Sequence, residues 1–298
     1  MIGEYYHTNA EFQIVSKSIG SPNPGNLLLH GSVKAAKNTP SPHVTWNFAK
    51  YSLPAVNNVL WVTLRKNHLT RPFIIFSLEK EDLEFGGLDL TDVFQELHVK
   101  FLDHFCDQVW IYGIKELLHM YKEWSHKHKM DGRLDLQDTN FYYMVPEVIQ
   151  ELERTGLQLH SDFYFDEIDF EKDLDLITNS WSLSMPLEKE QFRQKLTLLP
   201  YSLVREKETD KLACFELMDF SGCLNHQYTF PEFRRKGLAK CVEMDLCQKM
   251  IKKGDIPFKW VEAWNIDVIK PLERSNIWQR WQNKNGEYIT FSFLWNHC

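Results

Sequence analysis

The chain has 298 residues, of which 43% are hydrophobic and 25% charged, as in a globular protein of one large or two ordinary domains. Its formal net charge of −7, without a dominant basic stripe, argues against nucleic-acid binding. No apolar run approaches the roughly 20 residues that a membrane-spanning helix needs. The six cysteines form no CxxC pair and show no disulfide-like spacing, so we expect reduced thiols of an intracellular protein.

The N-terminal half alternates between strand-like and helix-like patterns. A first helix is expected within residues 1–25. Regular apolar spacing predicts two further helices, at 90–105 and 114–124, on either side of a short strand at 109–112. Four other short apolar runs predict strands, at 26–33, 43–48, 59–64 and 73–78.

Three polar segments of this half carry no predicted site. The glycine pair at 86–87 has no basic partner and is interpreted as a turn. His119, His126 and His128 lie among lysines without a carboxylate or cysteine to complete a ligand set, so no metal site is predicted. The polar segment 131–140 is the predicted linker.

The C-terminal half opens with a helix that Pro146 can start as its first residue. Further strands and helices follow, and the last is a strand at 288–295 in which apolar and polar residues alternate. In chain order they are a strand at 163–169, helices at 171–181 and 188–198, strands at 201–204, 211–220 and 223–230, a helix from 238 that Gly254 terminates, a strand at 259–264 and a helix that Asn265 caps.

The stretch 229–239 joins a predicted strand to a predicted helix. At such a junction the first backbone N–H groups of the helix have no partner, and with the positive end of the helix dipole they form an anion site. Arg234 can bind phosphate oxygens with its fork of N–H groups, and Gly237 lets a ligand approach the backbone closely. The small side chain of Ala239 leaves room beside the first turn of the helix. These residues predict a pyrophosphate site.

The spacing Arg234-x-x-Gly237-x-Ala239 resembles the coenzyme A loop of the GNAT acyltransferase superfamily. Together with its flanks it resembles the core signature of the glycine N-acyltransferase family. The resemblance is close over 212–242, looser on to about 281, and faint in the N-terminal half. The residues that carry it are Cys214-Phe215-Glu216-Leu217-Met218-Asp219, Ser221-Gly222, Thr229-Phe230-Pro231-Glu232-Phe233-Arg234, Gly237-Leu238 and, faintly, Leu29-His30-Gly31-Ser32-Val33.

The resemblance implies an α/β (α+β) chain with a GNAT fold in its C-terminal half, preceded by a degenerate GNAT-like half. The expected domains are 1–140, without its own CoA loop, and 160–298, the N-acyltransferase domain. The implied co-substrate is acyl-CoA or coenzyme A, and the implied partner is a small amine acceptor, with no nucleic acid and no membrane. The implied cofactor-binding residues are Tyr228, Thr229, Phe230, Arg234, Arg235, Lys236, Gly237, Leu238 and Ala239.

Catalysis needs an acceptor for the proton of the amine, which helps by roughly 10²–10⁴-fold. The position of the family's glutamate is Cys223 here, and a thiol with an ordinary pKa of about 8.5 is a poor substitute for a carboxylate. If that glutamate is the missing base, Cys223→Glu should raise activity and Cys223→Ser should keep most of it. A backbone N–H near Thr229 or Phe230 is expected to bind the thioester oxygen.

Other candidates for the proton acceptor remain open. Strand alternation puts Cys223, Asn225, Gln227 and Thr229 on one face and His226 on the other, so His226 would replace the glutamate only if a bulge intervenes. The acidic alternatives are Glu216, Asp219 and Glu262. Asn265 either contacts the pantetheine arm or serves only as a helix cap.

Two functions therefore stay open. The first is an N-acyltransferase that transfers an acyl group from acyl-CoA to the amine of glycine or another amino acid. The second is a CoA-binding protein that has lost its base and acts as a sensor or scaffold. The intact loop favours CoA binding in both, and Cys223 is the feature that separates them.

The N-terminal residues bear on location. Glu4 is present and no Lys or Arg precedes Lys17, whereas a secretory signal starts with basic residues and a mitochondrial presequence is rich in arginine. A cytoplasmic location is expected rather than the mitochondrial one that the resemblance implies.

Overall fold

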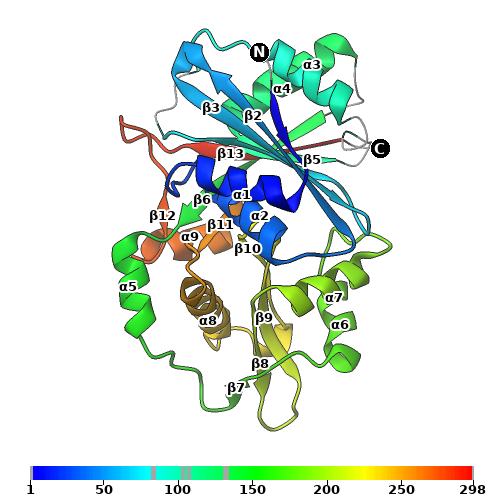
Figure 1. Cartoon of the computed structure of the whole chain (residues 1–298). Coiled ribbons are helices and arrows are strands. Elements are labelled where there is room, and N and C mark those ends of the chain that lie inside the picture. The colour runs from blue at the N-terminus through cyan, green and yellow to red at the C-terminus, as the bar shows by residue number, and fades with distance from the viewer. Residues whose placement is uncertain (1–2, 82–84, 102–104, 106–108, 130–133, 297–298) are drawn as a thin grey trace. The chain divides into compact units, whose positions relative to one another are not determined.

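The computed structural model describes residues 3–81, 85–101, 105, 109–129 and 134–296. Contacts between Cα atoms divide the chain into two compact units (Figure 1). The first unit combines Met1–Tyr142 with Trp260–Cys298, and the second is Tyr143–Lys259. The boundary between them near the C-terminal end falls inside a strand, β11 (Phe258–Glu262).

The first unit is built on a mixed sheet in the strand order β1-β2-β3-β4-β5-β13-β6-β11, with β12 beside β6. Neighbours from β1 to β4 pair antiparallel, and β4 and β5 pair parallel. The strands are β1 (Glu4–Tyr6), β2 (Val44–Leu53), β3 (Asn58–Asn67), β4 (Phe73–Leu78), β5 (Trp110–Ile114), β6 (Leu134–Tyr143), β12 (Gln279–Arg280) and β13 (Thr290–Asn296).

Helices and a dense aromatic core support this sheet. Phe76 on β4 packs against Phe94 and Tyr121, whose rings meet edge to face at 5.3 Å. Many of the tryptophans and phenylalanines of the chain are therefore core residues. The helices are α1 (Asn9–Ser18), α2 (Leu27–Asn38), α3 (Thr91–Lys100), α4 (Lys115–His128) and α9 (Ile266–Arg274), with a 3₁₀ turn η1 at Pro54–Val56.

The strand β13 lies between β5 and β6 and pairs antiparallel with both. Phe293, for example, is opposite Tyr112 on one side and Gln137 on the other. Residues 260–298 therefore group with the N-terminal part of the chain, whereas the expected domains place them with 160–259.

The second unit has a sheet in the order β10-β9-β8-β7. One face packs on α8, through Cys214, Leu238 and Val242, and the other on α6 and α7, through Phe192 and Phe215 (Figure 1). The elements are α5 (Pro146–Arg154), β7 (Phe163–Phe165), α6 (Phe170–Asn179), α7 (Glu188–Leu198), β8 (Tyr201–Glu206), β9 (Leu212–Met218), β10 (Leu224–Thr229), a 3₁₀ turn η3 (Pro231–Phe233) and α8 (Leu238–Lys252).

Several predictions of secondary structure are wrong in whole or in part. The helix expected at 90–105 begins at Thr91 and ends at Lys100. The run 26–33 was expected to be a strand but forms the first two turns of α2. Leu29–Val33, which resembles an early strand of the glycine N-acyltransferase family, is therefore helical here. Within the predicted linker 131–140, residues 134–140 belong to β6 and 131–133 lie outside the described residues. The strand expected at 163–169 ends at Phe165.

Among the described helices, none combines the length and the apolar character that crossing a bilayer requires.

Candidate functional site

The loop between β10 and α8 is anchored at one end and open at the other. Phe233 is 4% exposed and packs edge to face on Phe163, which holds the 3₁₀ turn against the sheet. Arg235 and Gly237 both have positive φ, 63° and 76°, so the chain reverses here and glycine suits the second position. A Cβ on Gly237 would meet no atom within 4 Å, which means that the space in front of this backbone is free of protein.

The start of α8 is an electropositive helix end. Cys241 N–H donates to Gly237 O over 3.3 Å, and the N–H groups of Leu238, Ala239 and Lys240 precede this first helical bond. The first turn contains no acidic residue, and its N-cap, Gly237, has no side chain to cap it. The partial positive charge of the helix dipole is therefore not neutralised by the helix's own residues.

Basic side chains surround this helix end, and Arg235, Lys236 and Lys240 are exposed. The ammonium of Lys236 lies 5.0 Å from the ring centroid of Phe163, a cation–π contact. Arg234 was expected to bind phosphate with its fork of N–H groups, but one of these is already used. Its Nε–H donates to Thr229 O over 3.1 Å and holds the loop on the end of β10. A phosphate contact of Arg234 would use its terminal nitrogens.

A β-bulge interrupts β10 between Asn225 and Tyr228. Asn225 is opposite Leu217, and Tyr228 is opposite Phe215, so both share the face that packs on α6 and α7. This corrects the alternation expected from sequence, which put Asn225 on the face of Gln227 and Thr229. His226, with φ of 55°, sits in the bulge.

His226 faces α6 and α7, the same side as Asn225, whereas the alternation expected from sequence put these two residues on opposite faces. Its ring packs within 5.1 Å of the rings of Trp181, Phe192 and Phe215, and its Nε2 is 2.9 Å from Ser180 Oγ. Burial, and secondarily the charge of Lys195, lowers the pKa of His226 to about 3. The imidazole is therefore neutral at physiological pH and is a weak proton acceptor.

Cys223 is fully buried in the turn between β9 and β10. Its carbonyl accepts the N–H of Asp219 over 2.9 Å, and its Sγ is 3.5 Å from Ser221 Oγ. Asp219 in turn accepts from Ser221 and forms a buried ion pair with Lys195, with 3.0 Å between Lys195 Nζ and Asp219 Oδ2. Cys223 is therefore enclosed, and the carboxylate of Asp219 in the same turn is already paired with Lys195.

Glu216 lies on the opposite face of the sheet, under α8. It is 3% exposed and accepts a hydrogen bond of 3.0 Å from the side-chain amide of Gln227. Glu243 of α8 and Lys259 of β11, both buried, are bonded to each other beside it. Burial, and then the charge of Glu243, raises the pKa of Glu216 well above its usual range.

Gln227, Glu243 and Lys259 were not singled out from sequence. One signal was present, because Glu216 interrupts the otherwise apolar run of β9. A carboxyl in such a strand needs polar partners on the helix that covers it.

Asn265 and Glu262 belong to the first unit, whereas the loop, His226 and Cys223 belong to the second. Asn265 is the N-cap of α9 through its carbonyl, which accepts the N–H of Ile269 over 3.0 Å. Its side chain makes no capping bond. A contact with a pantetheine arm stays a prediction.

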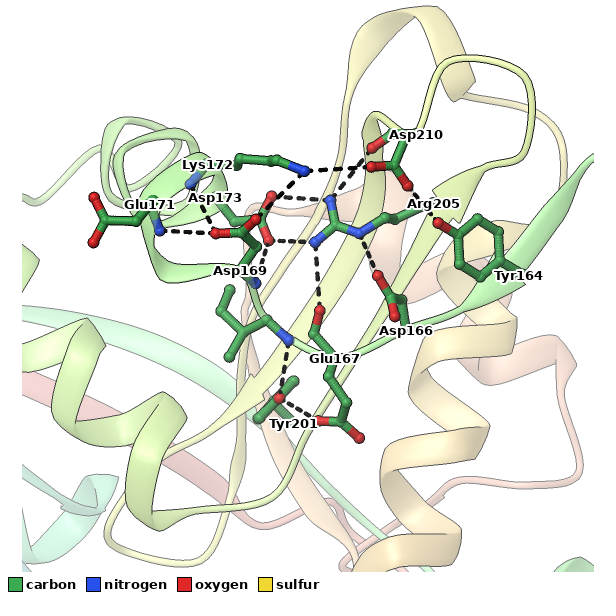
Figure 2. A network of polar contacts seen from close by, with 11 residues as sticks. Tyr164, Asp166, Glu167, Asp169, Glu171, Lys172, Asp173, Tyr201, Arg205 and Asp210 are labelled. Carbon is green, nitrogen blue, oxygen red and sulfur yellow. Dashed lines mark hydrogen bonds and ion pairs between the residues drawn. The ribbon is translucent and has the colours of Figure 1, made fainter.

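A charged network fixes the start of α6, the helix that has Ser180 as its C-cap (Figure 2). Arg205 on β8 binds Asp173 through both terminal nitrogens, at 3.0 and 2.5 Å, and Asp166 through Nε at 2.6 Å. Asp169 caps α6 by accepting the N–H groups of residues 171 and 172. The buried side chains of Arg205 and Asp173 thereby hold the β7–α6 connection on the sheet.

Comparisons with known proteins agree with this architecture. A family model described as FR47-like protein matches residues 201–283. The X-ray structure of a Drosophila protein aligns with a TM-score of 0.75 at 13% identity, over 99% of this chain and 98% of that one. A tandem GNAT protein from the clavulanic acid biosynthesis pathway, solved without AcCoA, aligns with a TM-score of 0.56 at 10% identity, over 98% of both chains.

A GCN5-related N-acetyltransferase from Sphaerobacter thermophilus aligns with a TM-score of 0.52 at 8% identity, over 98% of this chain and 94% of that one. A search of curated protein sequences found no match. The chain thus has a GNAT fold preceded by a GNAT-like half.

Proposed function

We propose that this protein is an acyl-CoA-dependent N-acyltransferase of the glycine N-acyltransferase type, which acylates the amine of glycine or another amino acid. The observation that carries the proposal is the start of α8, an electropositive helix end with an αL glycine, free space in front of it and no acidic residue in its first turn. A pyrophosphate is the ligand that suits unpaired N–H groups surrounded by Arg and Lys side chains.

In this proposal the N–H groups of Leu238, Ala239 and Lys240 bind the pyrophosphate, with Arg234, Arg235 and Lys236 beside them. Tyr228, Thr229 and Phe230 lead to the loop along β10. The oxyanion donor expected at Phe230 needs a correction, because the N–H of Phe230 donates to Ala213 O over 3.0 Å within the sheet. Another group must therefore donate to the thioester oxygen. The backbone N–H of the neighbouring Thr229 stays the predicted donor.

The reaction is a direct transfer in a ternary complex. The amine nitrogen attacks the thioester carbonyl, the C–S bond breaks, and the CoA thiolate and the amine proton leave separately. A pKa of about 3 makes His226 a poor acceptor for that proton, so we assign the proton to water.

A second function, CoA binding without catalysis, is favoured by the buried thiol at Cys223 and by the pairing of Asp219 with Lys195. Both functions require CoA binding at the loop. Release of free CoA thiol from acyl-CoA in the presence of amino acids distinguishes them, because only the enzyme releases it.

The binding test is calorimetry with CoA on the wild type and on Gly237→Glu. The new carboxylate would occupy the phosphate position, so we expect binding to be abolished. Gly254→Glu is the matched control, because Gly254 has the same φ of 76° and equally open surroundings at the other end of α8. Unchanged CoA affinity in Gly237→Glu would refute both functions.

A further inference from the structure

Three ionisable side chains are buried together between α8 and the sheet of the second unit. They are Glu216, Glu243 and Lys259, which are 3%, 8% and 6% exposed. One ammonium group cannot neutralise two carboxylates, and the bond between Lys259 and Glu243 engages the ammonium with the helix. Of these groups, the carboxyl of Glu216 is the one that burial drives toward its protonated form.

Gln227 connects this cluster to the loop. Its amide nitrogen donates to Glu216 Oε2 and to Ala239 O, each over 3.0 Å. An amide NH₂ has two hydrogens, and this arrangement uses both. Ala239 belongs to the first turn of α8, whose N–H groups form the electropositive end, so the amide fastens that turn to β10.

The bulge at 226–227 makes this connection possible. It places His226 on the side of α6 and α7 while Gln227, the next residue, turns toward α8. Without the extra residue, the side chains after the bulge would fall on the opposite faces of the sheet.

We propose that Gln227 and Glu216 are positioning residues of the CoA loop, and that ionisation of Glu216 strengthens CoA binding. An ionised carboxylate accepts from Gln227 more strongly than a neutral carboxyl does, and the same amide holds Ala239. This inference rests on the proposed CoA site. The groups that face Glu216 are Gln227 from β10, Glu243 and Cys247 from α8, Lys259 from β11 and Cys214 from its own strand.

The positioning role is tested by CoA calorimetry on Gln227→Met, which keeps the side-chain length and removes both donors. We expect CoA to bind about tenfold more weakly, the equivalent of roughly one hydrogen bond. The matched control is Gln248→Met. Gln248 makes the same kind of double bridge, to Leu152 O and Thr155 O at 2.8 Å each, about 13 Å further along α8.

Gln248→Met should lower the melting temperature without changing CoA affinity. Unchanged affinity in Gln227→Met, or an equal loss in both variants, would overturn the positioning role. If the wild type itself does not bind CoA, the proposed function fails instead, which keeps the two failures distinct.

The proton linkage is tested with Glu216→Gln, which keeps the acceptor oxygen and removes the charge. CoA affinity of the wild type should rise with pH through the pKa of Glu216, beyond the rise due to the ligand's own phosphates. In Glu216→Gln the CoA affinity should rise with pH only by the amount that the phosphates of CoA themselves cause. An identical pH profile in the two proteins contradicts the linkage, and this readout does not depend on catalysis.

Discussion

Ser180 Oγ and His226 Nε2 lie 2.9 Å apart, and this contact fixes the tautomer of His226. The Ser180 hydroxyl donates to Ile177 O over 2.7 Å, so its oxygen accepts the Nε2–H of the histidine. The lone pair then resides on Nδ1, which is buried and has no hydrogen-bond partner among the described residues. A site of this kind stabilises the neutral ring.

The first prediction concerns acid stability. His226 has a folded pKa of about 3, below its ordinary value of about 6.5, so the unfolded chain takes up a proton first as pH falls. The contribution of the neutral His226 ring to the free energy of unfolding is fully present above pH 6.5 and is lost as the pH falls toward 3. The slope from this group is at most about 1.4 kcal/mol per pH unit. Thermal unfolding of His226→Asn between pH 7 and 5 should show a smaller slope than the wild type.

Asparagine suits this test because it tolerates the positive φ of the bulge. His160→Asn removes an exposed histidine and serves as the control. An equal pH slope in wild type and His226→Asn would contradict the buried neutral ring. Because His98, with a pKa of about 4, adds its own acid dependence, the difference between the variants is the quantity to compare.

The second prediction concerns Cys223. Its thiol is fully buried, so an acyl-cysteine intermediate is not expected, and Cys223→Ser should keep most of the thiol-release activity at a cost of about 1 kcal/mol in stability. A trapped acyl mass on Cys223 would contradict this.

Cys223→Glu now has the opposite expectation from the one drawn from sequence. A carboxylate would be buried in the turn that already holds Asp219, with Lys195 engaged. We expect a loss of several kcal/mol in the free energy of unfolding rather than a gain in activity. Activity above the wild type, at an unchanged melting temperature, would show that the turn opens to the substrate.

The third prediction is a single CoA site per chain. In the first unit, α3 follows β4 as α8 follows β10, but Asp89 Oδ1 accepts the N–H of Thr91 at 2.9 Å. This hydrogen bond is the main reason why the pKa of Asp89 is lowered. The N-terminal end of α3 therefore already has a carboxylate bound to it. Calorimetry should give one CoA per chain, and none in Gly237→Glu. A second binding step that persists in Gly237→Glu would place a site in the first unit.

The fourth prediction concerns the network around Arg205. Arg205→Met should destabilise the protein by about 3–5 kcal/mol, because it leaves the carboxylate of Asp173, which is 1% exposed, without its cation. Arg193→Met, which removes an exposed pair with Glu190, should cost no more than about 1 kcal/mol. Denaturant unfolding measures both, and equal losses would show that Arg205 has no special role.

The fold of the second unit was predictable because its signals are local. The helix at Glu188–Leu198 and the strand–loop–helix order around Gly237 depend on periodicity and on one αL glycine. The run at Leu27–Leu29 was not predictable, since a short buried apolar run fits a strand and a helix equally well. The bulge at His226 left no sequence signal, and it decides which side chains meet. The partners of Glu216 could not be predicted either, because Lys259 is 43 residues away and only tertiary packing brings it there.

The position of β13 between β5 and β6 has a consequence for synthesis on the ribosome. When residues up to 143 have emerged, β5 and β6 still lack the strand that separates them, and about 150 more residues must follow before it is made. The edges of β5 and β6 that pair with β13 lack their native partner during that interval, and open strand edges invite pairing with other chains. Nascent chains halted before residue 290 should therefore depend on chaperones more than the finished protein does.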